Sequence, residues 1–289
     1  MKQSKKILIA NRGVIAIRAL RAARELGYSV ASVYSTIDRD QKHLKLSDEA
    51  ICIGPPETKD SYLNEAAIIS AAELSGADAI YPGFGFLADN ASFAEKCRES
   101  GFKFIGPDPE VIAIMGDKIK AKELAKSLNI PVVPGYEGEI STENEAIKIV
   151  EKIGYPVIIK ASAGGGGRGM RVVNSSDELW QSIQSAQNEA ELAFGDGKIF
   201  IEKYLKKPRH IEVQIFGNGK GEAVHLFTRD CSLQRKYQKI VEEAPALNID
   251  NQKLEEIQNL SVEACKKLNY EGAGTIEFLY ENNDFYFIE

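Results

Sequence analysis

The sequence predicts an α/β domain followed by an α+β domain, and three observations support this prediction. From residue 5 to about residue 107, short β-branched runs alternate with helical segments. Beyond residue 139 the rhythm changes to strands that follow one another across glycine-containing turns. The chain has 289 residues, which is enough for two compact units.

The first half alternates strands with helices. Helical segments are expected at residues 18–26 and 65–74, which predicts a Rossmann-like parallel sheet. Gly13 follows the first strand, but the G-x-G-x-x-G spacing is absent, so Gly13 is interpreted as a tight strand-to-helix turn instead of a dinucleotide site. The expected strands are KILIA, SVASVYS, AICIG, ADAIYPG and FKFIGP.

A break in the pattern separates the two halves. Residues 129–139 contain two prolines and two glycines, which favours a boundary close by. Helices are expected at residues 177–192 and 251–268. The strand-like runs are PVIIK, MRVV, KIFIE, IEVQIFG, AVHLFTR, GTIEFLY and DFYFIE, and their short connections predict largely antiparallel pairing.

Composition excludes several classes of protein. Lys and Arg number 36 and Asp and Glu 42, so the net charge of −6 gives no overall positive field to hold duplex nucleic acid. The four cysteines show no C-x-x-C pair, so we expect reduced, buried thiols. No apolar stretch approaches bilayer length, and the run behind the basic amino terminus is too short for a signal peptide. We therefore expect a cytoplasmic protein, or the mature part of an organellar one, that binds neither membrane nor nucleic acid.

A glycine-rich segment lies between two strand-like runs at residues 160–169. It reads Lys-Ala-Ser-Ala-Gly-Gly-Gly-Gly-Arg-Gly, and consecutive glycines can present backbone N–H groups to phosphate oxygens. No Gly-Lys-[Ser/Thr] follows, so it is not a Walker loop. Strand, glycine loop and strand indicate a hairpin flap that closes over a nucleotide. The alternative is an ordinary surface hairpin.

Two further patterns are weaker. If Leu279 lies opposite Phe287 in an antiparallel pair, Glu277 lies opposite Glu289, and two adjacent carboxylates favour a magnesium site. The alternative is a solvated pair on an exposed face. Residues 202–205 end a strand with mixed polar and apolar side chains, which suits an adenine pocket, although the pattern taken alone favours an edge strand.

Taken in order, a series of motifs resembles the biotin carboxylase family of ATP-grasp enzymes. The resemblance covers residues 7–289. The motifs are NRG, PGFGFLADNASF, FIGP, MGDK, YPVIIKAS, GGGGRGMRVV, EKYL, PRHIEVQ, RDCSLQR, QKIVEEAP and TIEF.

The resemblance implies an N-terminal domain over residues 1–116 and an ATP-grasp domain over 117–289, with a lid at roughly 132–204 and an incomplete C-terminal lobe. It implies an ATP-dependent ligase that phosphorylates bicarbonate to carboxyphosphate, which then carboxylates biotin on a carrier protein. The implied partners are ATP, bicarbonate, the biotin carboxyl carrier protein, a carboxyltransferase and, in the intact enzyme, a second copy of the chain.

The resemblance also implies roles for individual residues. The implied nucleotide contacts are Lys118, Lys160, His210, Gln234 and Tyr237, with Gly166 and Gly167 in the flap. The implied adenine pocket is formed by Glu202, Lys203, Tyr204 and Leu205. Glu277 and Glu289 are the implied ligands of Mg²⁺ or Mn²⁺, and Lys239 is the implied bicarbonate-binding residue.

Several positions depart from the family pattern. Val14 stands where the family has Glu, Tyr81 and Tyr237 stand where it has His, and Ala163 replaces the first flap glycine. The family continues beyond Glu289 with Asn-Pro-Arg, a catalytic Glu and a biotin-contacting Arg, so we expect a truncated chain that binds nucleotide but is itself inactive. The alternatives are another ATP-grasp ligase, such as a carbamoyl-phosphate synthetase half, and a non-catalytic nucleotide-binding module.

Overall fold

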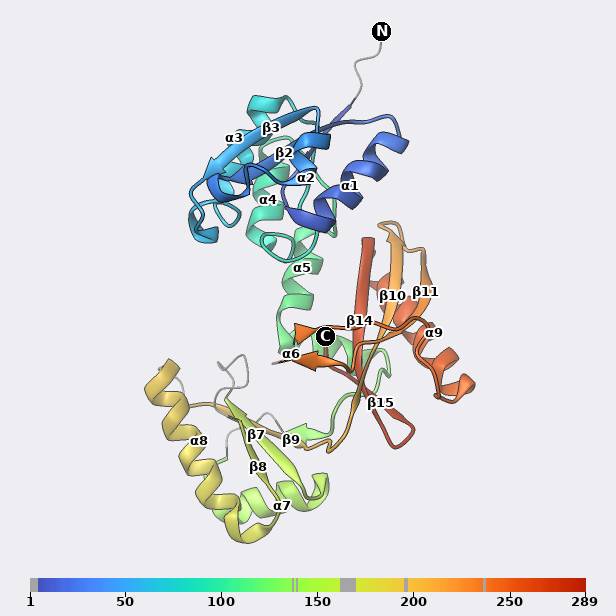
Figure 1. Ribbon diagram of the computed structural model, residues 1–289. Coiled ribbons are helices and arrows are strands. Elements are labelled where there is room, and N and C mark those ends of the chain that lie inside the picture. Colours follow the sequence, from blue (N-terminus) through green and yellow to red (C-terminus); the bar gives the residue numbers. More distant parts are fainter. Residues whose placement is uncertain (1–4, 137, 139, 162–169, 195–196, 236–237) are drawn as a thin grey trace. The chain divides into compact units, whose positions relative to one another are not determined.

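A computed structural model of the chain describes residues 5–136, 138, 140–161, 170–194, 197–235 and 238–289. The chain divides into two compact units, which are described separately (Figure 1). Unit 1 contains residues 1–121, 215–224 and 262–274, and unit 2 contains 122–214, 225–261 and 275–289. Within the described residues, no helix has both the length and the apolar character needed to cross a bilayer.

Unit 1 is built on a five-stranded parallel sheet with the strand order β3-β2-β1-β4-β5, which confirms the predicted α/β class. The order changes direction between β1 and β4, as in doubly wound folds. The strands are β1 (Lys6–Ile9), β2 (Ser29–Ser35), β3 (Glu49–Gly54), β4 (Ala79–Tyr81) and β5 (Lys103–Phe104). The helices are α1 (Gly13–Glu25), α2 (Lys42–Leu46), α3 (Glu65–Ser75), α4 (Ala91–Glu99), α5 (Pro109–Gly116) and α6 (Lys118–Ser127), the last of which continues into unit 2.

Helix α1 begins five residues before the expected start at residue 18. Gly13 has a φ of +65°, a left-handed conformation that glycine adopts without steric cost, and it turns the chain from β1 directly into the helix. The expected tight turn at Gly13 is therefore confirmed. Ala16, Leu20 and Ala23 recur at helical spacing and are buried, which fixes the face that packs inward.

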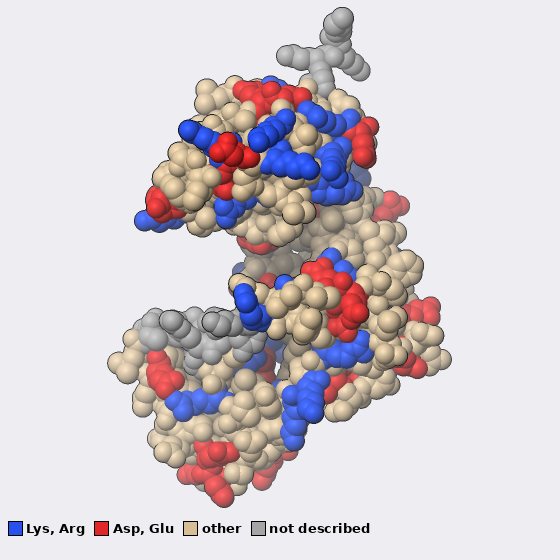
Figure 2. All heavy atoms as spheres, in the orientation of Figure 1, with Lys and Arg blue, Asp and Glu red and all other residues tan. Residues whose placement is uncertain are grey.

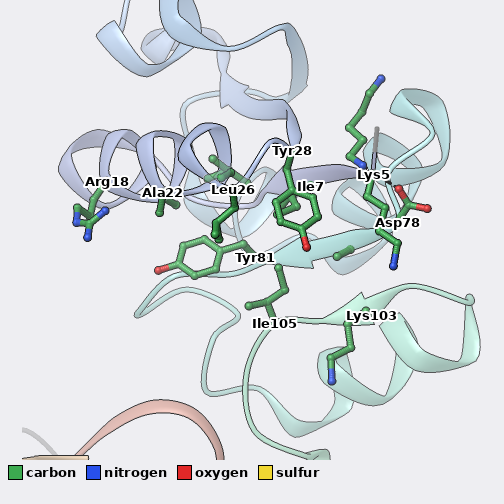
Figure 3. Close-up of a pocket in the computed structure, with 15 residues that line it drawn as sticks. Lys5, Ile7, Arg18, Ala22, Leu26, Tyr28, Asp78, Tyr81, Lys103 and Ile105 are labelled. Carbon is green, nitrogen blue, oxygen red and sulfur yellow. Dashed lines mark hydrogen bonds between the residues drawn. The ribbon is translucent and has the colours of Figure 1, made fainter. Parts of the chain in front are cut away.

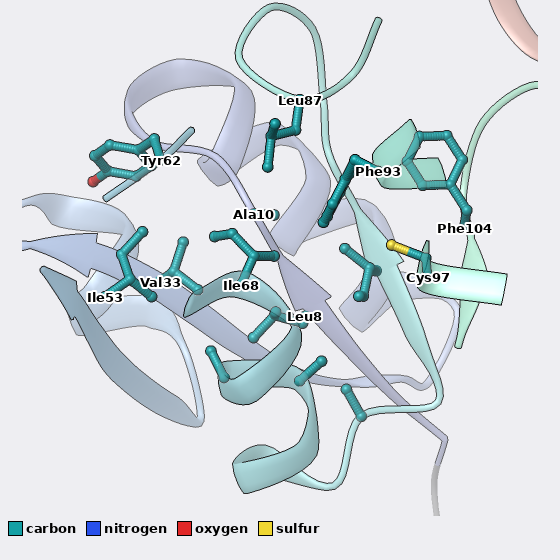
Figure 4. Close-up of a cluster of buried hydrophobic side chains, with 14 of the residues drawn as sticks. Leu8, Ala10, Val33, Ile53, Tyr62, Ile68, Leu87, Phe93, Cys97 and Phe104 are labelled. Atoms are coloured by element: carbon teal, nitrogen blue, oxygen red, sulfur yellow. The ribbon is translucent and has the colours of Figure 1, made fainter. Parts of the chain in front are cut away.

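The core of unit 1 lies between its sheet and its helices (Figure 4). Leu8, Val33 and Ile80 come from three neighbouring strands, and Ile68 and Phe93 come from α3 and α4. All five are fully buried, as expected for a parallel sheet that helices cover. Burying such side chains removes apolar surface from water and stabilises the unit by about 2 kcal/mol for each side chain.

Two antiparallel sheets and a short ribbon follow, which confirms the predicted α+β half. The first sheet has the order β6-β9-β7-β8 and the second β11-β10-β14-β15. The strands are β6 (Gly135–Tyr136), β7 (Val157–Ala161), β8 (Arg171–Val173), β9 (Ile199–Lys203), β10 (Arg209–Asn218), β11 (Ala223–Asp230), β14 (Glu271–Glu281) and β15 (Asp284–Phe287), and the ribbon pairs β12 (Gln234–Arg235) with β13 (Gln238–Lys239). The helices are α7 (Glu143–Ile153), α8 (Leu179–Phe194) and α9 (Asn251–Lys267).

One face of the β6-β9-β7-β8 sheet is apolar, and the other carries charged side chains. Ile159 of β7 and Ile201 of β9 lie directly opposite each other in a core shared with α7 and α8. The intervening residues, including Lys160 and Glu202, therefore lie on the opposite face of the sheet. Strands β7 and β8 pair as an antiparallel hairpin, as predicted for the sequence on either side of the glycine-rich segment.

The thiols fit the expectation from the sequence in three of four cases. Cys97, Cys231 and Cys265 are buried and free, whereas Cys52 is exposed. Figure 2 shows Lys and Arg interspersed with Asp and Glu on the face in view, so its described residues present no continuous basic field there.

Candidate functional site

A first charged cluster forms around the carboxylate of Glu202 on β9. Lys160 of β7 pairs opposite Phe200, and Glu202 pairs opposite Ile158, so Lys160 and Glu202 are diagonal neighbours on one face. Lys160 Nζ lies 2.6 Å from Glu202 Oε2. The other carboxylate oxygen, Oε1, accepts a hydrogen bond from Lys122 of α6.

The surroundings of Glu202 keep it ionised. Its side chain is only 6% exposed, and burial alone would raise its pKa. The positive charges of Lys160 and Lys122, together with their hydrogen bonds, outweigh burial and hold the pKa below its usual range. The cluster therefore contains a permanent carboxylate between two ammonium groups.

The predicted adenine segment is fixed on both sides. The backbone N–H of Lys203 donates to Pro134 O at 2.8 Å, and that of Tyr204 donates to Pro156 O at 3.0 Å. The Lys203 ammonium donates to Gly154 O and Tyr155 O at 3.0 and 2.8 Å. Strand β9 lies between β6 and β7, so the alternative interpretation of residues 202–205 as an edge strand is wrong.

A second charged cluster lies where β10, β13 and β14 contribute side chains. Lys239 Nζ donates to Glu212 Oε2 and to Glu277 Oε1, both at 2.5 Å. His210 Nε2 lies 3.0 Å from Glu277 Oε2, and Gln234 Nε2 lies 3.0 Å from His210 Nδ1. Because the Gln234 amide nitrogen is a donor, His210 Nδ1 accepts and the ring proton is assigned to Nε2, facing Glu277. Four residues that were proposed from the sequence, His210, Gln234, Lys239 and Glu277, are thus brought together.

The charges of this second cluster form a connected chain. Arg229 of β11 pairs with the other oxygen of fully buried Glu212, and its Nη1 lies 3.1 Å from Glu242 Oε2. Burial would raise the pKa of Glu277, but the hydrogen bonds from His210 and Lys239 and the Lys239 charge lower it to about 2. Burial would lower the pKa of Lys239, but its two carboxylate partners raise it above the usual range. Glu277 and Lys239 are therefore both charged at neutral pH.

The predicted register of the β14–β15 hairpin is wrong by one residue. Leu279 lies opposite Tyr286, not Phe287. Near the end of the chain, however, Ile288 N and Glu289 N point to Glu277 O at 2.9 and 3.5 Å, and Glu277 N donates to Glu289 O at 2.7 Å. Two residues thus oppose one, as in a β-bulge, and the backbone of Glu289 still lies opposite that of Glu277.

A divalent cation fits this region chemically. Among the described residues, His210, Glu212 and Glu277 have possible ligand atoms within 4.8 Å of one another. Glu289 is not in that group. Glu277 is one of the two metal ligands predicted from the sequence. Ionised carboxylates suit Mg²⁺ and Mn²⁺. Both ring nitrogens of His210 are engaged, by Gln234 and by Glu277, so the carboxylates are the ligands that suit the ion.

Three predicted site residues, Gly166, Gly167 and Tyr237, lie outside the described residues, as does Ala163, which departs from the family pattern. Lys118 begins α6, and its side chain is likewise not described. Sequence reasoning missed Lys122, Glu212 and Arg229. Strand alternation could have identified Glu212, because it lies two residues after His210 on the same strand and therefore on the same face.

Two of the positions that depart from the family pattern lie in unit 1. Val14 is in the first turn of α1 and is 85% exposed. Tyr81 ends β4 and lines a cavity of about 620 Å³ together with Leu26 and Tyr28 (Figure 3). No proposed nucleotide, metal or bicarbonate residue lines that cavity among the residues that the structure describes.

Comparison with known families finds two matches that divide the chain between them. Residues 3–112 match the family described as biotin carboxylase, N-terminal domain. Residues 117–289 match the family described as carbamoyl-phosphate synthase L chain, ATP binding domain.

Individual relatives agree with these matches. The biotin carboxylase of Pseudomonas aeruginosa is 54% identical over 285 residues, which is 98% of this chain and 64% of that protein. The protein named biotin carboxylase 1 of Bacillus subtilis is 49% identical over 287 residues, which is 99% of this chain and 64% of its own length. The chain thus spans less than two thirds of the length of these relatives.

Solved structures give the same result. A complex of the Campylobacter jejuni biotin carboxylase described as containing β,γ-ATP superposes with a TM-score of 0.87 at 50% identity, covering 99% of this chain and 65% of that one. The biotin carboxylase domain dimer of the Hydrogenobacter thermophilus 2-oxoglutarate carboxylase, described in complex with MgADP, ADP and bicarbonate, gives a TM-score of 0.85 at 46% identity, covering 100% and 64%.

The ordered motifs, the two successive domain matches and the shared fold agree with one another. This chain belongs to the biotin carboxylase family and contains that family's N-terminal domain followed by its ATP-grasp, ATP-binding domain.

Proposed function

We propose that the chain supplies the nucleotide-binding part of a biotin carboxylase. In the intact enzyme it takes part in the ATP- and bicarbonate-dependent carboxylation of biotin on a carrier protein, by way of carboxyphosphate. The domain division at residues 116 and 117, with a lid at roughly 132–204, belongs to this proposal. The observation that carries it is the second cluster, in which His210, Gln234, Lys239 and Glu277 meet although they come from four strands.

ATP binds, in this proposal, through both clusters. Lys160 and Lys118 contact its phosphates, with Gly166 and Gly167 above them, and residues 202–205 hold the adenine. Support comes from the fixed backbone of residues 203 and 204 and from the ammonium group of Lys160, whose side chain is 31% exposed beside Glu202. His210, Gln234 and Tyr237 complete the set of nucleotide contacts.

Glu277 and Glu289 hold Mg²⁺ or Mn²⁺ in this proposal. The low pKa of Glu277 keeps it ionised for that role, and the bulge keeps the Glu289 backbone opposite it. The metal would neutralise charge on the ATP phosphates. Lys239 binds bicarbonate: an ammonium has three donors, and described carboxylates use two of them.

The remaining partners follow from the family. A biotin carboxyl carrier protein delivers biotin, a carboxyltransferase uses the product, and a second copy of the chain forms a homodimer when the enzyme is intact. The Hydrogenobacter thermophilus relative, described as a dimer with bicarbonate and nucleotide, supports the last of these. A cytoplasmic location stays a prediction.

The proposal is tested by calorimetric titration of the purified chain with MgATP. We expect binding in the wild type and a loss of at least about tenfold in affinity for Lys160→Ala, because a charge-assisted contact to phosphate disappears. Lys152→Ala, which changes an exposed lysine at the end of α7, is the matched control and should bind as the wild type does. An unchanged dissociation constant for Lys160→Ala would argue against the nucleotide site.

Two alternative functions are separated by activity assays. A carbamoyl-phosphate synthetase-like ligase is favoured by the description of the family matched over residues 117–289, and it predicts carbamoyl phosphate formation with an ammonia source. A non-catalytic module predicts MgATP binding without bicarbonate-dependent ATP hydrolysis. We expect negligible carboxylation of free biotin by these 289 residues alone, and robust turnover would contradict that expectation.

A further inference from the structure

The carboxylate of Glu202 has a separate cation for each of its oxygens. Lys160 reaches Oε2 from the neighbouring strand, and Lys122 reaches Oε1 from α6, 80 residues away in the sequence. Glu202 is almost completely buried, so a partner is needed to keep its charge from being left uncompensated. Either lysine alone supplies that partner.

The two lysines differ in how accessible they are. The Lys122 side chain is 16% exposed and the Lys160 side chain 31%. The ring of Phe200 supports both cations, with its centroid 5.2 Å from Lys122 Nζ and 5.8 Å from Lys160 Nζ. Lys122 is therefore the more deeply held of the two, and Lys160 is the one that can turn toward a ligand.

A lysine that is the sole partner of a buried carboxylate does not leave it readily for another anion. If Lys160 were alone with Glu202, moving its ammonium to a phosphate would leave the carboxylate buried and unpaired. With Lys122 on the other oxygen, Lys160 can move while Glu202 keeps a charge-assisted hydrogen bond.

We propose that Lys122 is a positioning residue of the nucleotide site, which neutralises Glu202 so that Lys160 is available to the phosphates of the nucleotide. This inference rests on the proposed ATP-binding function and adds to it a residue that acts through Glu202 without touching the nucleotide. It predicts a specific signature: losing Lys122 weakens binding of the charged part of the ligand and spares the nucleoside.

The experiment compares MgATP with adenosine by calorimetric titration of the full chain. For Lys122→Met we expect the affinity for MgATP to fall about tenfold and that for adenosine to stay within about twofold. Lys122→Arg should restore MgATP affinity to within about threefold, since a guanidinium can still pair with Glu202. Lys120→Met, an exposed lysine on the same helix, is the matched control and should leave both affinities unchanged.

A second background tests whether Lys122 acts through Glu202. In a Glu202→Gln chain there is no charge to neutralise, so adding Lys122→Met should change MgATP affinity by less than about twofold. A full effect of Lys122→Met in that background would show direct contact with the nucleotide and overturn the positioning role.

The remaining outcomes separate the two proposals. Unchanged MgATP affinity in Lys122→Met, or an equal loss for MgATP and adenosine, would overturn the role of Lys122 while the nucleotide site stands. If the wild type fails to bind MgATP, the proposed function itself fails. Thermal unfolding of each variant identifies misfolded protein, and in that case Lys122→Gln, which is uncharged but retains a hydrogen-bond donor, replaces Lys122→Met in the same comparison.

Discussion

The two charged clusters of unit 2 differ in whether one cation serves one carboxylate or two. Around Glu202, one carboxylate has two ammonium groups, and each of its oxygens has its own partner. In the other cluster the pairs are connected in series, from Arg229 through Glu212 and Lys239 to Glu277 and His210. Loss of one lysine from the first cluster removes a partner from one carboxylate, whereas loss of Lys239 from the second removes a partner from both Glu212 and Glu277.

The two arrangements suit different kinds of ligand. Two lysines that serve only one carboxylate suit a site in which one of them moves to meet phosphate, because its departure affects no other ion pair. A connected chain of fixed charges suits a site that holds a small anion or a metal in one geometry, because preorganised groups need no rearrangement when the ligand arrives.

The largest expected effect concerns Glu212, the most buried residue of the connected series of ion pairs. Glu212→Gln removes a carboxylate that pairs with Arg229 and Lys239, and we expect the free energy of unfolding to fall by about 3 kcal/mol. Chemical denaturation measures this, with Glu263→Gln, an exposed residue of α9, as the control. A loss of unfolding free energy below about 1 kcal/mol would show that these ion pairs do not stabilise one another.

A second effect, of similar or smaller size, is the pH dependence of the stability that Glu277 contributes. The folded-state pKa of Glu277 is about 2, below its ordinary value, so the unfolded state binds more protons between about pH 4.5 and 2. The stability that ionised Glu277 contributes is complete above that window and is lost as pH falls through it, amounting to about 3 kcal/mol at most.

Glu277→Gln provides the measurement. The difference in unfolding free energy between wild type and Glu277→Gln should shrink as the pH is lowered from about 6 toward 2. A difference that stays constant with pH would mean that Glu277 has an ordinary pKa and that its partners do not stabilise the ionised form.

The smallest expected effect uses Lys203 as a reference. Its ammonium donates to two backbone carbonyls, not to a carboxylate, so Lys203→Met removes hydrogen bonds without leaving a charge unpaired. We expect a loss of about 1–2 kcal/mol in thermal or chemical unfolding. If Lys203→Met lowers the unfolding free energy as much as Glu212→Gln does, then losing any hydrogen-bonded lysine is equally destabilising. The connection between charges would then not explain the effect of Glu212→Gln.

Much of the site was accessible to sequence reasoning, because its motifs occur in a fixed order. The strand, glycine and strand pattern predicted the β7–β8 hairpin, and the motif positions of His210, Gln234, Lys239 and Glu277 proved to be neighbours. The register of the last hairpin is set by its two-residue turn: Asn282 and Asn283 both have a positive φ, and Glu281 pairs with Asp284. The predicted register assumed a turn one residue longer. The bulge at residues 288 and 289 then brings the backbone of Glu289 back opposite that of Glu277.

The sequence by itself determined the order of the two domains, the parallel and antiparallel classes of their sheets and the position of the turn at Gly13, because these depend on patterns within a few residues of one another. Only the tertiary structure decided that Lys122 meets Glu202 and that Arg229 and Lys239 share Glu212. Spacing along a chain restricts neighbours within one helix or strand. Contacts between side chains of separate elements depend on how those elements pack, which no local pattern specifies.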